Sequence, residues 1–313
     1  MRTLQLHRPL LVTALAMIGL IVVSAAGLAL DDRTLLGVPI WLKPLKFSIS
    51  ITIYTLTIAW LLSLVQRGRR VGWWLGTGIA VAMVLEMVII VGQVVRGRQS
   101  HFNVATALDA TLYSTMGATI AGTWVATAAI AVLLMRQKIA DRANALAVRG
   151  GLAVALLGMA IGFLMTRPTS QQVATMADQA PSLVGAHGVG VEDGGPGLPL
   201  VNWSTVGGDL RVGHFIGMHA LQALPLLALA LVFAAQRIRR LRDERVRLRL
   251  VAVAVGAYAG FTGLVTWQAL RGQSLVHPDA LTLAVAALLG VAVVGGTLWA
   301  TRSATVTEAV LAR

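Results

Sequence analysis

The 313-residue chain is 57% hydrophobic and only 12% charged, with a mean hydropathy of +0.77. These values exclude an ordinary soluble domain, in which about 45–50% of residues are apolar and about 25% are charged. The chain has no cysteine, which excludes disulfides, thiolate metal sites and cysteine nucleophiles. Its net charge of +13 is the one bulk property that it would share with a nucleic-acid-binding protein.

Long apolar runs predict an all-α polytopic membrane bundle of eight helices. The runs are continuous and do not alternate as β-barrel strands do. The first is about 22 residues long, longer than a typical signal-peptide core, so we expect it to be retained as a span. The predicted spans lie near residues 9–30, 45–65, 73–95, 111–135, 148–166, 213–236, 248–269 and 280–301.

The basic residues predict which side of the membrane each connection occupies. Eighteen of the 26 Lys and Arg residues fall in the segments on the same side as the two termini, and eight fall on the other side. By the positive-inside rule this places both termini in the cytoplasm and predicts a multi-pass protein of the bacterial cytoplasmic (inner) membrane. Seven arginines lie between Arg237 and Arg249, in one predicted inner loop. Such a loop meets anionic lipid headgroups, so the lipid bilayer is an expected partner and nucleic acid is not.

Two short signatures recur in the same order and predict an internal duplication. Gly-x-Pro followed by Trp precedes the second span at residues 37–41 and the sixth at residues 197–203. Gln-x-x-Arg-Gly ends the third span at residues 93–97 and the seventh at residues 268–272. Because four helices separate the copies, the two halves have the same orientation and form a parallel repeat.

The duplication predicts two units, a four-helix repeat at residues 1–145 and a second four-helix repeat at residues 146–313. The second carries a long outer loop at residues 167–212. A loop of this length is typically a functional lid or disordered. Leu198, Leu200 and Trp203 are interleaved with its Gly and Pro residues, so we expect an ordered cap.

Polar residues gather on the predicted outer side, where they predict an extracytoplasmic-facing pocket of His, Gln and Arg side chains. All five histidines after His7 map to that side. The long loop adds acidic and aromatic residues to the duplicated Gln and Arg. The candidate ligand-binding residues are Gln93, Arg96, His101, Asp193, Trp203, Asp209, Arg211, Gln222, Gln268 and Arg271.

Two residues within the predicted spans are candidates for catalysis or proton transfer. Glu86 lies deep in the third span, where a carboxylate costs roughly 2.5–3.5 kcal/mol and is a functional candidate by default. His219 shares a helix face with Gln222, three residues later. His214, five residues before His219, points about 140° away, so the two histidines cannot both bind one ion from the same face.

Four segments resemble the motifs of an uncharacterised family of multi-pass bacterial membrane proteins. They are residues 43–47, 96–103, 193–204 and 214–222, read as Lys-Pro-Leu-Lys-Phe, Arg-Gly-Arg-Gln-Ser-His-Phe-Asn, Asp193 through Ser204, and His-Phe-x-Gly-x-His-Ala-Leu-Gln. The resemblance covers most of the chain from the second to the seventh span. It implies the class of protein and no activity.

The layout is also similar to that of haem A synthases, which have eight helices in two parallel halves, outward-placed histidines and a polar loop over the site. This likeness implies haem as a candidate cofactor, with His214, His219, His101 and His277 as candidate ligands. The chain departs from that family because it has no cysteine pair and because no histidine follows Glu86 by four residues.

Three functions stay open on these residues, one of them without catalysis. The first is a haem- or quinone-binding redox or haem-processing role, in which Arg96, Arg211 and Arg271 hold acidic substituents. The second is a proton-coupled transporter of a small solute that uses Glu86. The third is a membrane assembly protein, in which Arg96 and Arg271 only complete helix ends.

Overall fold

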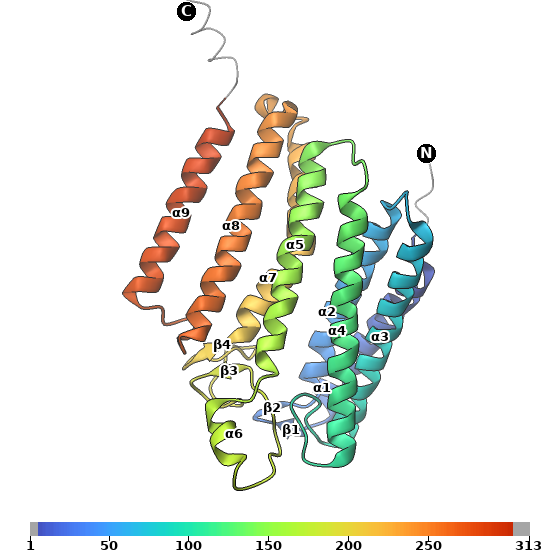
Figure 1. Cartoon of the computed structure of the whole chain (residues 1–313), viewed down its shortest axis with the longest axis vertical. Coiled ribbons are helices and arrows are strands. Elements are labelled where there is room, and N and C mark those ends of the chain that lie inside the picture. Colours follow the sequence, from blue (N-terminus) through green and yellow to red (C-terminus); the bar gives the residue numbers. More distant parts are fainter. Residues whose placement is uncertain (1–5, 303–313) are drawn as a thin grey trace, which may run out of the picture.

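The computed structural model describes residues 6–302, which fold almost entirely into helices (Figure 1). Eight of the helices in this range are long and apolar enough to cross a membrane, which confirms the eight predicted spans. They are α1 (Arg8–Leu30), α2 (Leu42–Ser63), α3 (Arg69–Val95), α4 (Ala107–Met135), α5 (Arg142–Met165), α7 (Leu210–Ala234), α8 (Glu244–Leu270) and α9 (Ala280–Ala300).

The short elements lie at the two ends of the helices. The β-hairpin of β1 (Thr34–Leu35) with β2 (Val38–Pro39) and the two-stranded antiparallel sheet of β3 (Gly188–Val189) with β4 (Gly208–Asp209) lie at one end together with α6 (Ser170–Thr175) (Figure 1). We call this the hairpin end. The 3₁₀ helix η1 (Arg239–Arg242) and the turns at residues 64–68 and 136–141 lie at the opposite end, the arginine end. Helix α1 starts and α9 finishes at the arginine end.

Several helices begin at a polar capping residue that lies before the start of the apolar run. Asp141 accepts a hydrogen bond from the backbone N–H of Asn144 at 2.8 Å, so α5 begins at Arg142, six residues before the predicted start. Arg149 is therefore inside the helix. Helix α2 begins at Leu42, three residues before its predicted start, without a side-chain cap, and this places Lys43 in its first turn. Lys43 lies before the predicted span at residues 45–65, whereas Arg149 lies within the predicted span at residues 148–166.

The helices pack in two groups. Helices α1 to α4 pack on one another, as do α5, α7, α8 and α9, and the main contact between the groups is that of α4 with α5. The closest crossing joins α5 and α7, where a Cβ added to Gly158 would lie 2.4 Å from the backbone of Gly217. Only glycine allows this approach, and small residues serve the same purpose in many membrane helix pairs. The division into two repeats stays a prediction.

The outer surfaces of the helices are apolar, as expected for contact with lipid. In α9, Leu288 is 69% exposed and Val291 is 70% exposed. The buried core lies mainly among α1 to α4, where Ile58, Leu61 and Ile90 are completely enclosed. Because apolar surface faces outward on every long helix, the side chains follow the pattern of a protein solvated by hydrocarbon chains.

Candidate functional site

A cavity of about 1120 Å³ lies at the hairpin end, between the helices and the long segment that connects α5 to α7. We call this segment, residues 166–209, the cap. The cavity walls come from the start of α2, the end of α3, the loop at residues 96–106, the cap and the first turns of α7. Much of the lining is apolar and includes Leu36, Phe47, Ile90, Val94, Phe102 and Phe215.

The cap is ordered by bonds to its neighbours. Val104 N donates to Ser182 O at 2.9 Å, and Val184 N donates to Phe102 O at 2.8 Å, so the cap pairs with the loop at residues 96–106. On the other side, Ser274 Oγ donates to Ser204 O at 3.2 Å. The long loop is therefore ordered and covers a pocket, while the side of the membrane on which it lies stays a prediction.

Lys43 and His101 form a polar contact on the cavity wall. Lys43 Nζ donates to His101 Nδ1 at 3.0 Å, although 58 residues separate them in the sequence. Since Nδ1 accepts this bond, the neutral ring carries its proton on Nε2. Burial lowers the pKa of His101 well below its ordinary value, and the charge of Lys43 acts in the same direction. His101 is therefore neutral and offers the cavity a donor group.

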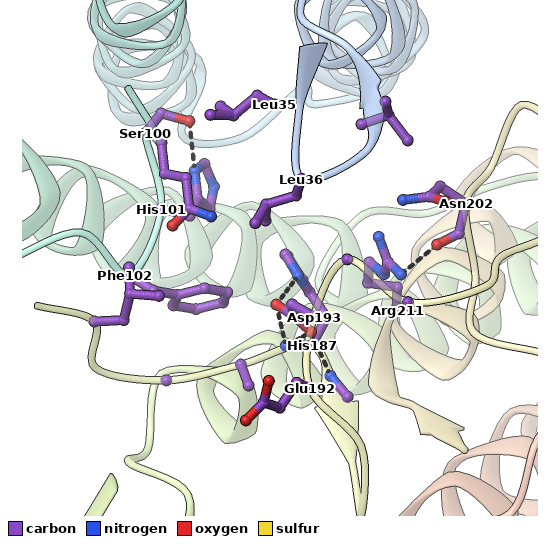
Figure 2. A pocket seen from close by; sticks show the side chains of 18 of the residues that line it. Leu35, Leu36, Ser100, His101, Phe102, His187, Glu192, Asp193, Asn202 and Arg211 are labelled. Atoms are coloured by element: carbon purple, nitrogen blue, oxygen red, sulfur yellow. Dashed lines mark hydrogen bonds and ion pairs between the residues drawn. The ribbon is translucent and has the colours of Figure 1, made fainter. Parts of the chain in front are cut away.

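His187 and Asp193 form a second polar pair, in the cap (Figure 2). His187 Nδ1 donates to Asp193 Oδ2 at 2.7 Å, and the backbone N–H of Gly188 donates to Oδ1 of the same carboxylate at 2.9 Å. Burial acts to raise the pKa of Asp193, but these hydrogen bonds outweigh it and hold the pKa well below its usual range. Asp193 is thus ionised.

The ring of His187 is held in a defined orientation with its second nitrogen unused. Burial lowers the pKa of His187, and the hydrogen bond to Asp193 only partly opposes this effect. With Nδ1 donating to the carboxylate, Nε2 of the neutral ring keeps a free lone pair, and no described residue bonds to it. Phe102 packs edge-on against the ring at 4.8 Å between centroids. His101 and His187 therefore offer the cavity a donor and an acceptor respectively.

Arg211 and Lys46 join the helices to the cap. Arg211 forms an ion pair with Asp209 at 2.6 Å. It also donates a hydrogen bond to Asn202 O, which Figure 2 shows. Lys46 Nζ donates to Val201 O at 3.2 Å. Both cations lie in the first turns of their helices, α7 and α2, and both bonds end on the same turn of the cap.

The cavity lining has more cations than its acids can neutralise. The lining holds four cations, Lys43, Lys46, Arg98 and Arg211, and three acids, Glu192, Asp193 and Asp209; Asp209 pairs with Arg211, and Asp193 accepts from the neutral ring of His187. Lys43, Lys46 and Arg98 also line the cavity but form no ion pair with a described residue. Lys43 and Lys46 are half-buried, whereas Arg98 is exposed, and half-buried ammonium groups without a carboxylate partner are unfavourable unless an anion is bound. The arrangement is therefore suited to an anionic ligand with an apolar part.

The first copy of the duplicated Gln-x-x-Arg-Gly signature forms a helix end. Gln93 Nε2 donates to Asp109 Oδ1 at 2.9 Å and to Gln99 O at 3.3 Å, while Arg96 pairs with Asp109 at 2.7 Å. Gly97 has a φ of +66°, the left-handed conformation that ends many helices. The glutamine thus ties down the turn after α3, and the arginine joins it to α4.

The second copy has the same structure. Gln268 Nε2 donates to Ser274 O at 2.6 Å, Arg271 pairs with Asp279 at the start of α9, and Gly272 has a φ of +72°. In both copies the glutamine bonds to the carbonyl six residues later. None of the four Gln and Arg side chains lines the cavity. Their role in ligand binding stays a prediction, whereas their role in closing the turns is visible.

The predicted histidines of α7 lie beneath the cavity and not in its wall. His214 Nδ1 donates to Gly158 O of α5 at 2.8 Å. His219 Nδ1 donates to Gln222 Oε1 at 3.3 Å, as their shared face predicts, and Gln222 Nε2 donates to Thr57 of α2 at 3.1 Å. These side chains connect helices within the bundle.

The remaining candidates lie on either side of this region. His277 is exposed and donates from Nδ1 to Thr205 O of the cap at 3.1 Å. Trp203 does line the cavity, with Asp193, Asp209, Arg211 and His101. Residues 6–302 contain no group of three or more His, Asp or Glu side chains that could hold a metal ion. Haem ligation, which needs only one or two histidines, stays a prediction.

Glu86 is enclosed in the middle of the bundle. It is 1% exposed, and Thr119 Oγ1 of α4 donates to its Oε2 at 3.2 Å. Its Oε1 is buried and bonds to no described residue. Ile90, one helical turn nearer to the hairpin end on the same face of α3, lines the cavity. The carboxyl group therefore lies about one turn below the cavity.

Sequence reasoning missed Lys43, Lys46, Arg98 and His187 as site residues. A signal existed for two of these positions. Lys43 and Lys46 are three apart at the start of a span, and therefore share the face of α2 that turns to the cap. His187 lies in a loop six residues before Asp193, a spacing that permits a local hydrogen bond but does not require one.

Compared with protein-family models, curated proteins and solved structures, the chain matches none of them. The resemblances drawn from its motifs and layout therefore stay predictions, and the function is argued from the site alone.

Proposed function

We propose that this protein binds an organic anion with a large apolar part in the cavity at the hairpin end. The observation that carries the proposal is the set of three cations, Lys43, Lys46 and Arg98, that line a partly apolar cavity and form no ion pair with a described carboxylate. Charged groups recognise the acidic substituents of such a ligand, and the apolar walls contribute the larger share of the binding energy.

Within this class, haem fits the lining better than a quinone does. A haem carries two carboxylates, which the cations would hold, and it needs an imidazole with a free nitrogen. His187 offers such a nitrogen, and the carboxylate of Asp193 behind it is the usual partner of a metal-binding histidine. A bound haem would supply redox chemistry or be itself the compound processed. A quinone head group has no anionic substituent and leaves the cations without a role.

Three related porphyrins test the proposal on the purified protein. Protoporphyrin IX has the ring and both carboxylates, its dimethyl ester has the ring alone, and haemin adds the iron. We expect protoporphyrin IX to bind and the ester to bind at least about 10-fold more weakly, the effect of losing one charge-assisted bond or more. The same loss is expected when Lys43 and Lys46 are both replaced by Gln. Arg33→Gln, which removes an exposed cation outside the cavity, is the matched control.

Haemin separates the haem proposal from the broader one. If His187 binds the iron, haemin binds more tightly than protoporphyrin IX and gives a Soret band that shifts in His187→Ala. Similar binding of all three porphyrins would overturn the proposed role of the cations. A Soret spectrum that is unchanged in His187→Ala would overturn haem ligation by this residue. Failure of every probe to bind, with no compound copurifying, would favour the assembly role.

A second function, proton-coupled transport, is favoured by the buried Oε1 of Glu86 that has no described partner. A carboxyl group in this position is suited to carry a proton, because hydrocarbon surroundings strongly favour its neutral form. It would exchange that proton with the cavity, one helical turn away. In this proposal the cap gates the cavity and the bound anion is carried across the membrane.

Uptake into proteoliposomes tests the transport proposal. Protoporphyrin IX uptake should increase when a pH gradient is imposed, and the increase should disappear in Glu86→Gln, a change that preserves shape. Asp178→Asn, which changes an exposed carboxylate of the cap outside the cavity lining, is the matched control. Gradient-dependent uptake that persists in Glu86→Gln would contradict the role of this carboxyl group.

We further propose that the hairpin end faces the outside of a bacterial cytoplasmic membrane and that both termini are cytoplasmic. The excess of basic residues at the arginine end supports this orientation. The matching hydrogen-bond patterns of the two Gln-x-x-Arg-Gly turns support descent of the two halves from one parallel repeat.

A further inference from the structure

A second pocket lies at the arginine end, far from the cavity. It is lined by the turn between α4 and α5, by the first two turns of α5 and by Leu248 of α8, and its volume is about 530 Å³. Lys138, Arg142 and Arg149 contribute three cations to this lining. Ile139, Leu146 and Leu248 contribute apolar side chains beside them.

No carboxylate among residues 6–302 forms an ion pair with these three cations. The two nearest acidic side chains are already bonded. Asp141 pairs with Arg247 at 2.9 Å, and Glu244 accepts the backbone N–H of Arg142 at 2.7 Å. The positive charge of the pocket is therefore available for a ligand.

Arg149 is the least exposed of the three cations and is held in position. Its guanidinium donates to Met135 O at 3.2 Å and to Gln137 O at 3.1 Å, while its Nε is buried and bonds to no described residue. A buried charged group without an anionic partner is costly, and the charge of a phosphate bound in the pocket would reduce this cost.

The base of the pocket is preorganised by Gln137. The side chain of this residue is 5% exposed and accepts from the backbone N–H groups of Gln66 and Arg67 at 2.9 and 3.2 Å. It also donates to Arg67 O and Leu133 O. Since these bonds tie two turns of the chain together, the backbone that carries Lys138 needs little reorganisation before a ligand binds.

From this geometry we infer that the pocket binds the phosphate headgroup of an anionic phospholipid, with the acyl chains along Leu146 and Leu248. Phosphate oxygens suit a pocket that three cations line, and the apolar side chains beside them suit the start of the acyl chains. Basic pockets between membrane helices are established sites for such headgroups. The inference does not depend on the ligand of the cavity at the hairpin end.

Native mass spectrometry of the full chain in detergent tests the site. We expect the protein to retain phosphatidylglycerol or cardiolipin and to lose phosphatidylcholine. The double variant Lys138→Gln with Arg142→Gln keeps Arg149, which supports the turn, and should retain the anionic lipid about 30-fold more weakly. That change corresponds to about 1 kcal/mol for each cation. The matched control is Arg239→Gln with Arg240→Gln, two exposed cations at the same end outside the pocket.

The outcomes separate a specific lipid site from general attraction. An equal loss in the pocket and control variants would overturn the site in favour of diffuse electrostatic attraction. Displacement of the lipid by millimolar sodium phosphate would show a phosphate site with no preference for lipid. Retention by the pocket variant at the wild-type level would also overturn the inference, provided that both variants melt within a few degrees of the wild type.

Discussion

His101 and His187 carry their protons on opposite nitrogens, although both rings line the same cavity. Lys43 donates to one ring and Asp193 accepts from the other. The identity of the partner therefore decides whether an imidazole acts as a donor or as an acceptor, and residue type alone does not reveal this. The histidines of α7 show the same dependence on the partner, because His214 bonds to a backbone carbonyl of α5 and His219 bonds to Gln222 within α7.

The neutral state of His101 predicts how stability depends on pH. Burial and the charge of Lys43 lower the pKa of His101 well below its ordinary value, whereas the unfolded chain titrates at about 6.5. Below about pH 6.5 the unfolded state therefore binds a proton that the folded state does not, and stability falls with falling pH. We expect the apparent melting temperature in detergent to fall between about pH 7.5 and pH 5. His101→Gln should reduce the fall, because Gln accepts from Lys43 without titrating.

The control for this measurement is His277→Gln. His277 is exposed, so its removal should leave the dependence of the melting temperature on pH close to that of the wild type. A fall of equal size in His101→Gln and the wild type would mean that another group governs the acid sensitivity.

Among the elements, the turns at the hairpin end contain the strained backbone of the described chain. The four residues other than glycine with positive φ in residues 6–302 are Leu36, Phe102, Leu200 and Asn202. Three of them, all except Leu200, line the cavity. Such conformations cost of order 1–3 kcal/mol each and concentrate at functional sites. Leu36 occupies the turn between β1 and β2, where asparagine is the usual residue.

This strain predicts that asparagine at Leu36 or at Leu200 stabilises the protein, and that only the change at Leu36 also affects ligand binding. Leu36→Asn and Leu200→Asn should each raise the apparent melting temperature by about 2–4 °C, because asparagine adopts positive φ more readily than leucine. Only Leu36→Asn should weaken the binding of protoporphyrin IX, measured by porphyrin fluorescence, since Leu200 lies outside the cavity lining. Equal effects of the two variants on binding would exclude a direct role for the Leu36 side chain.

The spans could be predicted from the sequence because a helix that crosses the hydrocarbon layer needs an unbroken run of apolar residues. The helix starts could be predicted less well. Asp141 and the first turn of α5 are polar, so hydropathy alone places them in a loop, and only the capping bond shows that the helix has begun. The role of the duplicated glutamines in closing turns could not be predicted, because their bonds to Gln99 O and Ser274 O depend on turns that no hydropathy pattern describes.

At the scale of the whole molecule, the candidate site depends on segments that are distant in the sequence. Lys43 meets His101, and Lys46 meets Val201, only because α2, the loop at residues 96–106 and the cap converge at one end. No local spacing predicts such pairs. The sequence did predict the end at which they meet. The connections with few Lys and Arg residues, which were predicted to lie on one side of the membrane, all lie at the hairpin end (Figure 1).

The absence of cysteine allows the orientation of the whole molecule to be measured with single substitutions. Ser182→Cys places one thiol on the exposed surface of the cap, and Arg240→Cys places one on η1. If the cavity opens to the outside, a membrane-impermeant maleimide should label Ser182→Cys in intact spheroplasts and Arg240→Cys only after permeabilisation. Val125→Cys is the control, because this side chain is 61% exposed but lies midway along α4, where lipid shields it from the reagent. The reverse pattern would place the cavity in the cytoplasm, where its anionic ligand would come from metabolism inside the cell and the arginine end would face the outer leaflet.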